Sequence, residues 1–81
     1  MNEPSATQYD YKLDTSGLNC PEPLMIVRNK VRKMKKGERL LILATDPSTH
    51  RDFSNFCRFM GHSLELAETA LSVKKYIIRK G

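Results

Sequence analysis

Hydrophobic and polar residues follow two different periods along the chain. In residues 9–14, Tyr9, Tyr11 and Leu13 alternate with charged side chains, which is typical of a strand with one buried face. After residue 20 the apolar positions instead recur every three or four residues, as on one face of a helix: Leu24, Val27, Val31 and Met34. A strand followed by an amphipathic helix is therefore predicted.

Proline and lysine residues suggest the limits of this first helix. Pro21 suits a first-turn position, because the N–H that proline lacks would have no partner there. Lys35 and Lys36 are expected in the last turn, where cations complement the helix dipole, and Gly37 is expected to end the helix.

The next segment predicts a central strand and a second helix. Residues 39–45 contain an unbroken apolar run, as in a strand covered by other elements. Asp46 and Pro47 have the residue types of a helix N-cap and first helical position, and Gly61 is expected to end this helix. Its apolar stripe is predicted to consist of Phe53, Phe56, Cys57 and Met60.

Two further strands complete the predicted order, β-α-β-α-β-β. Leu64 and Leu66 alternate with polar residues in the third strand, and residues 72–80 predict a fourth strand after a turn at 69–71. Right-handed crossovers make the first three strands parallel and place both helices on one face, with the fourth strand antiparallel. We therefore expect an α/β two-layer sandwich with a mixed four-stranded sheet, in which Cys20 and Asp46 meet at one pole.

The length of the chain limits it to one domain. Its 81 residues provide for a single hydrophobic core. Residues 1–8 show no apolar periodicity, so we expect a flexible N-terminal tail followed by one domain over residues 9–81. No secretory leader or bilayer-spanning stretch is recognisable, and we expect a cytoplasmic protein without a membrane partner.

Cys20 is the residue best placed for chemistry, because it precedes Pro21, Glu22 and Pro23. A residue before proline is extended, as an N-cap residue is, so Cys20 is expected to cap the first helix. There the Glu22 N–H and the helix dipole would stabilise a thiolate, while the two prolines stiffen and position the loop. The Glu22 carboxylate would oppose the thiolate at close range and is expected to point away. The alternative is a purely structural cysteine in a turn.

Cys57 and the two histidines do not predict a second site. Cys57 lies on an apolar helical stripe and is expected to be buried and inert, and we expect no disulfide between Cys57 and Cys20. Two cysteines so far apart do not indicate a zinc ribbon. His50 and His62 are distant from Cys20 in sequence, and nothing else supports a hydrolytic Cys–His pair. Neither a metal nor a bound cofactor is expected.

Four segments resemble the TusA (SirA/YhhP) sulfur-carrier family, and look closest to its TusA branch. They are residues 18–25, which contain the Cys-Pro-Glu-Pro box, and residues 46–52, 56–60 and 76–81. A Cys-Pro-x-Pro box that opens the first helix is typical of this family. The resemblance spans roughly residues 9–81.

The resemblance implies a two-layer α/β fold and a persulfide carrier. By position, Cys20 would accept sulfane sulfur from a cysteine desulfurase and pass it to the cysteine of a downstream relay protein. In the TusA branch the relay ends in 2-thiolation of the tRNA wobble uridine, with tRNA contacted indirectly. Related proteins instead supply molybdenum-cofactor synthesis or sulfur oxidation. Such a protein acts by relay rather than as a self-contained multi-turnover enzyme, and we expect a monomer.

The charge of the chain adds a candidate docking surface. Lys and Arg number 14 against 9 Asp and Glu, a net charge of +5, which favours an anionic partner or an acidic protein surface. Arg28 and Arg32, one helical turn apart, would flank the docking site, and Met25 and Phe59 would supply exposed apolar anchors. Asp46, at the pole of Cys20, is assigned to the same partner-binding surface. A solvated basic helix face is the alternative.

Two other classes of function are weighed against the carrier. A small RNA-binding module would use the basic helix together with stacking aromatics. Tyr9, Tyr11 and Tyr76 lie on predicted strands, but no glycine-rich RNA-binding segment accompanies them. A thiol redox adaptor would need a resolving cysteine close to Cys20, which the sequence lacks.

Overall fold

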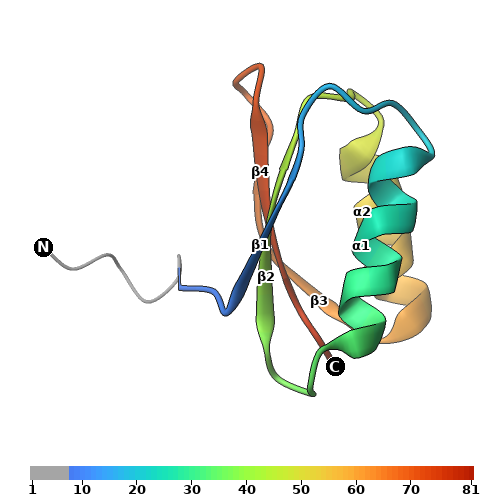
Figure 1. The fold of residues 1–81 in the computed structure, drawn as a ribbon, viewed down its shortest axis with the longest axis vertical. Coiled ribbons are helices and arrows are strands. Elements are labelled where there is room, and N and C mark those ends of the chain that lie inside the picture. Colours follow the sequence, from blue (N-terminus) through green and yellow to red (C-terminus); the bar gives the residue numbers. More distant parts are fainter. Residues whose placement is uncertain (1–7) are drawn as a thin grey trace, which may run out of the picture.

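The computed structural model describes residues 8–81, so residues 1–7 of the expected tail lie outside the described part of the chain. Its elements follow the predicted order: β1 (Tyr11–Thr15), α1 (Glu22–Lys33), β2 (Arg39–Ala44), α2 (Thr49–Met60), β3 (Ser63–Glu68) and β4 (Lys74–Arg79). Figure 1 shows one sheet with both helices on the same face. The predicted α/β two-layer sandwich is confirmed.

The four strands form a mixed sheet in the order β1-β2-β4-β3. β1 is parallel to β2, whereas β4 is antiparallel to both of its neighbours, β2 and β3. β3 therefore runs in the direction of β1 and β2, as predicted. The carboxyl ends of β1 and β2 consequently lie side by side, and the loops that lead into the two helices start from the same edge of the sheet.

The hydrophobic core lies between the sheet and the helices. Alternate residues of β2 are fully buried there, and β4 adds Tyr76 and Ile78. The helices contribute Val27, Val31, Phe53, Phe56 and Cys57. Each large apolar side chain buried in this way contributes about 1.5–3 kcal/mol, so the shared core is what holds the two helix starts in place.

One polar contact within the core ties α2 to β4. The hydroxyl groups of Thr49 and Tyr76 are 2.7 Å apart, and Thr49 Oγ1 also donates to the carbonyl of Asp46 at 2.9 Å. The ring of Phe53 packs edge-on against Tyr76, with 4.9 Å between ring centroids. The first turn of α2 is thereby anchored to the middle of the sheet.

The structure corrects the predicted ends of α1. The helix begins at Glu22 with Pro21, not Cys20, at the N-cap, and ends at Lys33. Lys35 and Lys36 therefore follow the helix, and Gly37 lies in the turn beyond it with φ of +89°. The reason is tertiary: Lys80 Nζ donates to the carbonyls of Arg32 and Met34, and thus satisfies helix-end carbonyls without a glycine cap.

α2 begins later than predicted and ends where predicted. Thr49 is its first residue and Ser48 its N-cap, so Asp46 and Pro47 precede the helix. The Asp46 side chain instead bonds to the neighbouring loop and to Ser48. Gly61 ends the helix in a left-handed conformation, with φ of +78°. The predicted place of Met60 in the buried stripe is wrong, because this last helical residue is 63% exposed.

The strand ends also differ slightly from the prediction. β1 begins at Tyr11 rather than Tyr9, and the turn after β3 extends over residues 69–73, so β4 begins at Lys74. β3 matches the predicted alternation but shifts register between Leu64 and Leu66. In the described residues, neither helix has the length and apolar character to cross a membrane.

Candidate functional site

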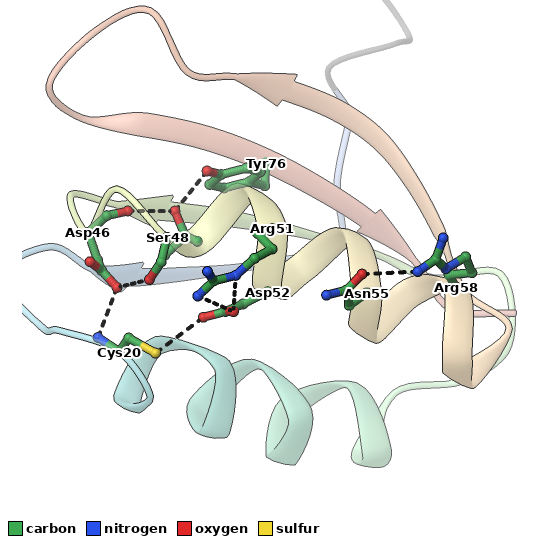
Figure 2. Close-up of polar contacts among 9 residues, drawn as sticks. Cys20, Asp46, Ser48, Arg51, Asp52, Asn55, Arg58 and Tyr76 are labelled. Carbon is green, nitrogen blue, oxygen red and sulfur yellow. Dashed lines mark hydrogen bonds and ion pairs between the residues drawn. The ribbon is translucent and has the colours of Figure 1, made fainter.

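Cys20 lies in the loop between β1 and α1, with its residue exposed to solvent. Its backbone N–H donates to Asp46 Oδ2 at 2.8 Å, and the Ser48 hydroxyl donates to the same oxygen at 2.8 Å (Figure 2). Asp46 belongs to the loop after β2, so its carboxylate joins the two loops that leave this edge of the sheet. The predicted meeting of Cys20 and Asp46 is thus confirmed.

Asp46 is suited to this contact because it is held as a carboxylate. The hydrogen bond from Ser48 and the backbone N–H of Cys20 lower the pKa of Asp46, against the opposing effect of burial, and the charge of Arg51 adds to the lowering. Asp46 is only 9% exposed. The side chain therefore faces the loop of Cys20, and little of it is available to a docking partner.

The Cys20 sulfur contacts a second carboxylate that the sequence analysis did not single out. The thiol donates to Asp52 Oδ2, with 3.4 Å between sulfur and oxygen. Asp52 lies in the first turn of α2, and its side chain is 15% exposed. Its other oxygen, Oδ1, is 3.4 Å from Nε of Arg51. Figure 2 shows the sulfur pointing from the start of α1 toward α2.

The predicted hydrogen bond between the backbone N–H of Glu22 and the Cys20 sulfur is wrong. The Glu22 N–H donates to the carbonyl of Asn19 at 2.9 Å, which takes the place of a thiolate as its acceptor. The residue Glu22 is exposed, whereas Pro23 is buried against the core. Pro21 serves as the N-cap, and its peptide bond with Cys20 is cis. The loop is therefore shaped by the prolines and by Asp46, not by a cysteine cap.

Cys57 is buried, whereas Cys20 is exposed. Cys57 is 4% exposed within the core, and burial raises the pKa of its thiol to about 11. A thiol that stays protonated and buried is a poor nucleophile. The prediction of a structural Cys57 is confirmed, and Cys20 and Cys57 are both free thiols.

Three of the predicted partner-binding residues line one groove between α1 and α2. This groove has a volume of about 550 Å³, and its lining includes Arg28, Arg32 and Phe59. Asp52 lines the same groove, so the groove reaches the residue that contacts the Cys20 sulfur. Phe59 is 77% exposed.

Met25 lies outside this lining, although it is also a large exposed apolar residue, with an exposed fraction of 54%. Because Met25 is on α1, it belongs to the same helix as the two groove arginines. Apolar anchors are thus exposed both in the groove and next to it, as at many protein interfaces.

Of the three tyrosines, only Tyr9, which precedes β1, has an exposed ring, with an exposed fraction of 44%. Tyr76 is completely buried, and Tyr11 packs against the core while Lys30 Nζ lies 3.9 Å from its ring centroid. Stacking of RNA bases requires exposed rings. Residues 8–81 also contain no cluster of three or more His, Cys, Asp or Glu side chains that could hold a metal ion.

A two-layer α/β domain with one exposed cysteine, directly before a proline at the start of a helix, is the architecture of a small thiol-bearing carrier. The family model described as sulfurtransferase TusA matches residues 11–80, and the chain belongs to this family. The resemblance found in the sequence is thereby confirmed. Family membership indicates a sulfur-carrier role and, in general terms, partner proteins of a sulfur relay.

A solved structure has the same fold. The crystal structure of a SirA-like protein from Desulfitobacterium hafniense superposes with a TM-score of 0.78 over 89% of this chain and 99% of that chain, at 19% sequence identity. The β-α-β-α-β-β arrangement is therefore that of a SirA-like domain.

Proposed function

We propose that the protein accepts sulfane sulfur from a cysteine desulfurase as a persulfide on Cys20. It then passes this sulfur to the cysteine of a downstream relay protein, in the pathway of 2-thiolation of tRNA wobble uridine. The observation that carries the proposal is the contrast between the two thiols. Cys20 is exposed in a braced loop, whereas Cys57 is buried with a raised pKa.

The chemistry requires two thiol exchanges and no net oxidation. The Cys20 thiolate attacks the terminal sulfur of the donor persulfide, a sulfur–sulfur bond forms, and the donor cysteine leaves as a thiolate that takes up the proton lost by Cys20. In the second step the acceptor thiolate attacks the terminal sulfur on Cys20: a bond from this sulfur to the acceptor forms, its bond to Cys20 breaks, and Cys20 leaves as a thiolate. The chain needs only an accessible sulfur held in a fixed position.

The groove between the helices supports docking of protein partners beside that sulfur. Arg28 and Arg32 present positive charge, and Phe59 presents a large exposed apolar surface. Interface energy is concentrated in such arginine and aromatic residues. An acidic partner surface with an apolar element would complement this groove, and Met25 would extend the contact along α1.

Asp46 contributes by positioning rather than by docking. Its carboxylate fixes the backbone of Cys20, and so it sets where the sulfur stands relative to the groove. Pro21 restricts the same loop and Pro23 restricts the first turn of α1, while the exposed Glu22 lies between them. A carrier shared by two partners benefits from this arrangement, because each partner must meet the sulfur at the same place.

The final acceptor distinguishes tRNA thiolation from the alternatives. Delivery of sulfur to molybdenum-cofactor synthesis or to sulfur oxidation would use the same persulfide on Cys20. These pathways would differ only in the protein that next accepts the sulfur. In the proposed pathway tRNA is contacted by a later component, and this chain acts as a monomer in the reducing cytoplasm, where its thiols stay free. Tyr76 is buried and Tyr11 is partly buried, so Tyr9 is the one tyrosine with an exposed ring, and this argues against direct RNA binding through stacked aromatics.

Intact-mass spectrometry tests the central step. The protein is incubated with a cysteine desulfurase and L-cysteine, alongside Cys20→Ser and Cys57→Ala variants. One sulfur atom should be added to the wild type and to Cys57→Ala, but not to Cys20→Ser. An unmodified Cys20 under conditions that load another relay protein would overturn the proposal. Transfer from loaded protein to candidate acceptors then identifies the pathway.

A further inference from the structure

The contact between Cys20 and Asp52 places a negative charge directly against the sulfur. Asp52 Oδ2 is 3.4 Å from Cys20 Sγ, and its side chain is 15% exposed. The two residues are 32 positions apart in sequence: Cys20 lies in the loop before α1, and Asp52 lies in the first turn of α2. The contact therefore results from the packing of α2 beside the loop of Cys20, and not from local chain geometry.

Among the charged groups around this contact, Asp52 is the carboxylate that contacts the sulfur itself. Asp46 accepts the backbone N–H of Cys20 and the hydroxyl of Ser48. Arg51 pairs with Asp52 Oδ1 at 3.4 Å, but the Arg51 side chain is 71% exposed, so water screens much of its charge. Arg28 of α1 lines the same groove as Asp52.

A carboxylate at this distance responds in opposite ways to two forms of a cysteine. It accepts a hydrogen bond from a neutral thiol, because the thiol has a proton to donate. It repels an anionic sulfur, because a like charge within a few ångströms disfavours the charged form. A persulfide is more acidic than its parent thiol, so at neutral pH the loaded cysteine is an anion and has no proton to offer.

We propose that Asp52 distinguishes the unloaded carrier from the loaded one: it holds the neutral Cys20 thiol against α2 and repels the anionic persulfide into solvent, where an acceptor can reach it. This inference rests on the proposed function, since it concerns the state of the same sulfur. Loading transfers one sulfane sulfur from a donor persulfide, R–S–SH, to Cys20–SH, and the products are Cys20–S–S⁻, the donor thiol R–SH and a proton released to water. The Sγ–H to Oδ2 hydrogen bond is thereby lost without any oxidation.

The test compares the rates at which one uncharged reagent alkylates Cys20 in its unloaded state and in its loaded state. Iodoacetamide alkylates the unloaded thiolate, and it also alkylates the terminal sulfur of the persulfide, with iodide leaving in each case. The persulfide is prepared with inorganic polysulfide, so that no desulfurase is needed. Mass spectrometry of the Cys20 peptide gives the two rates for wild type, Asp52→Asn and Asp52→Glu.

Asp52→Asn should change the two rates in opposite directions. The neutral amide is a weaker acceptor than the carboxylate, so the unloaded sulfur is held less firmly against α2, and its alkylation at neutral pH should become about threefold faster. The asparagine N–H can donate to the persulfide anion and retain it, so alkylation of the loaded form should become about threefold slower. The loaded-to-unloaded rate ratio thus falls by about tenfold, while Asp52→Glu, which keeps the charge, retains most of the wild-type ratio.

Two controls separate this effect from a loosened structure. Glu68→Gln removes one negative charge from an exposed residue at the end of β3 and should leave both rates unchanged. Cys57 serves as an internal reporter, because alkylation of this buried thiol would reveal unfolding. Rates that rise together, or an unchanged ratio in Asp52→Asn, would overturn the role of Asp52.

The outcome is independent of whether a desulfurase loads the protein. If the tenfold change in ratio is found but the desulfurase does not transfer sulfur, the charge effect stands and the carrier function fails. If transfer succeeds but the ratio is unchanged, the carrier function stands and Asp52 has no part in distinguishing the two states.

Discussion

Asp46 holds Cys20 by its backbone, through a hydrogen bond of 2.8 Å from the Cys20 N–H to Oδ2. The bond connects the loops that follow two adjacent parallel strands, β1 and β2. Ser48 shares the same oxygen and fixes its orientation. The side chain of Cys20 is left free of this bond, so the loop is restrained while the sulfur stays accessible.

Replacement of Asp46 by alanine should disturb the position of the Cys20 sulfur more than it changes the intrinsic reactivity of the thiol. We expect persulfide transfer from the desulfurase to slow by about tenfold, since a small displacement of a reacting group is costly. Alkylation by iodoacetamide, which needs no docking geometry, should change by less than about threefold. Asp46→Asn, which keeps an oxygen acceptor, should restore part of the transfer rate. Equal losses in both assays would show that the thiol chemistry itself depends on Asp46.

Labelling of Cys57 should require unfolding of the protein, whereas labelling of Cys20 should not. At pH 8 iodoacetamide should label Cys20 in the native protein and leave Cys57 unlabelled, because burial raises the pKa of Cys57 to about 11. In concentrated urea both residues should be labelled. Peptide mapping by mass spectrometry gives the two extents separately. Native labelling of Cys57 at a rate similar to that of Cys20 would contradict its place in the core.

Much of the fold was predictable because burial follows the period of the element in β2 and α1, although three consecutive residues of β4 are buried. In β2 the burial of residues alternates strictly, and the apolar stripe of α1 includes Val27 and Val31. Topology rules then placed the loops after β1 and β2 at one edge, which correctly brought Cys20 and Asp46 together. These features depend on short-range patterns that can be read from the sequence, or on rules of chain topology that apply to any sequence.

The errors arose where another group, in most cases one distant in sequence, replaced the expected partner. Lys80, at the far end of the chain, bonds to the last carbonyls of α1, so the helix ends before the lysines expected in it. The Glu22 N–H is taken by Asn19, and the sulfur contacts Asp52 instead. Asp52 ends the 46–52 segment of the family resemblance, but neither periodicity nor charge pattern pairs it with Cys20, because this contact depends on how α2 packs beside the first loop.

Stability should decline as the pH falls through the range around the ordinary pKa of histidine. Burial, together with the charge of Lys80, lowers the pKa of His62 in the folded protein. The unfolded imidazole therefore binds protons more readily than the folded one, and protonation favours unfolding below about pH 6.5. Urea midpoints measured from pH 8 to pH 5 should show this loss in the wild type but not in His62→Gln.

A second acid transition should follow from Asp46. Hydrogen bonds from Ser48 and Cys20 lower its pKa in the folded state, so its contribution is present above the unfolded value of about 3.9 and is lost as the pH falls through the folded value. Asp46→Asn cannot lose a charge, and its urea midpoint should fall less between pH 5 and pH 3. An equal fall in both proteins would assign the acid sensitivity to other carboxylates.

Charge reversal in the groove tests whether partners dock beside the sulfur. Arg28→Glu should slow persulfide transfer from the desulfurase by about tenfold, the effect of losing one interface anchor, and Phe59→Ala should act similarly. Lys12→Glu makes the same charge change on an exposed residue of β1 and should leave transfer nearly unchanged. All three variants should keep wild-type alkylation of Cys20, since a small reagent does not need the groove. If Lys12→Glu slows transfer as much as Arg28→Glu, overall charge and not the groove guides the partner, and a direct test of salt-dependent tRNA binding becomes the more informative measurement.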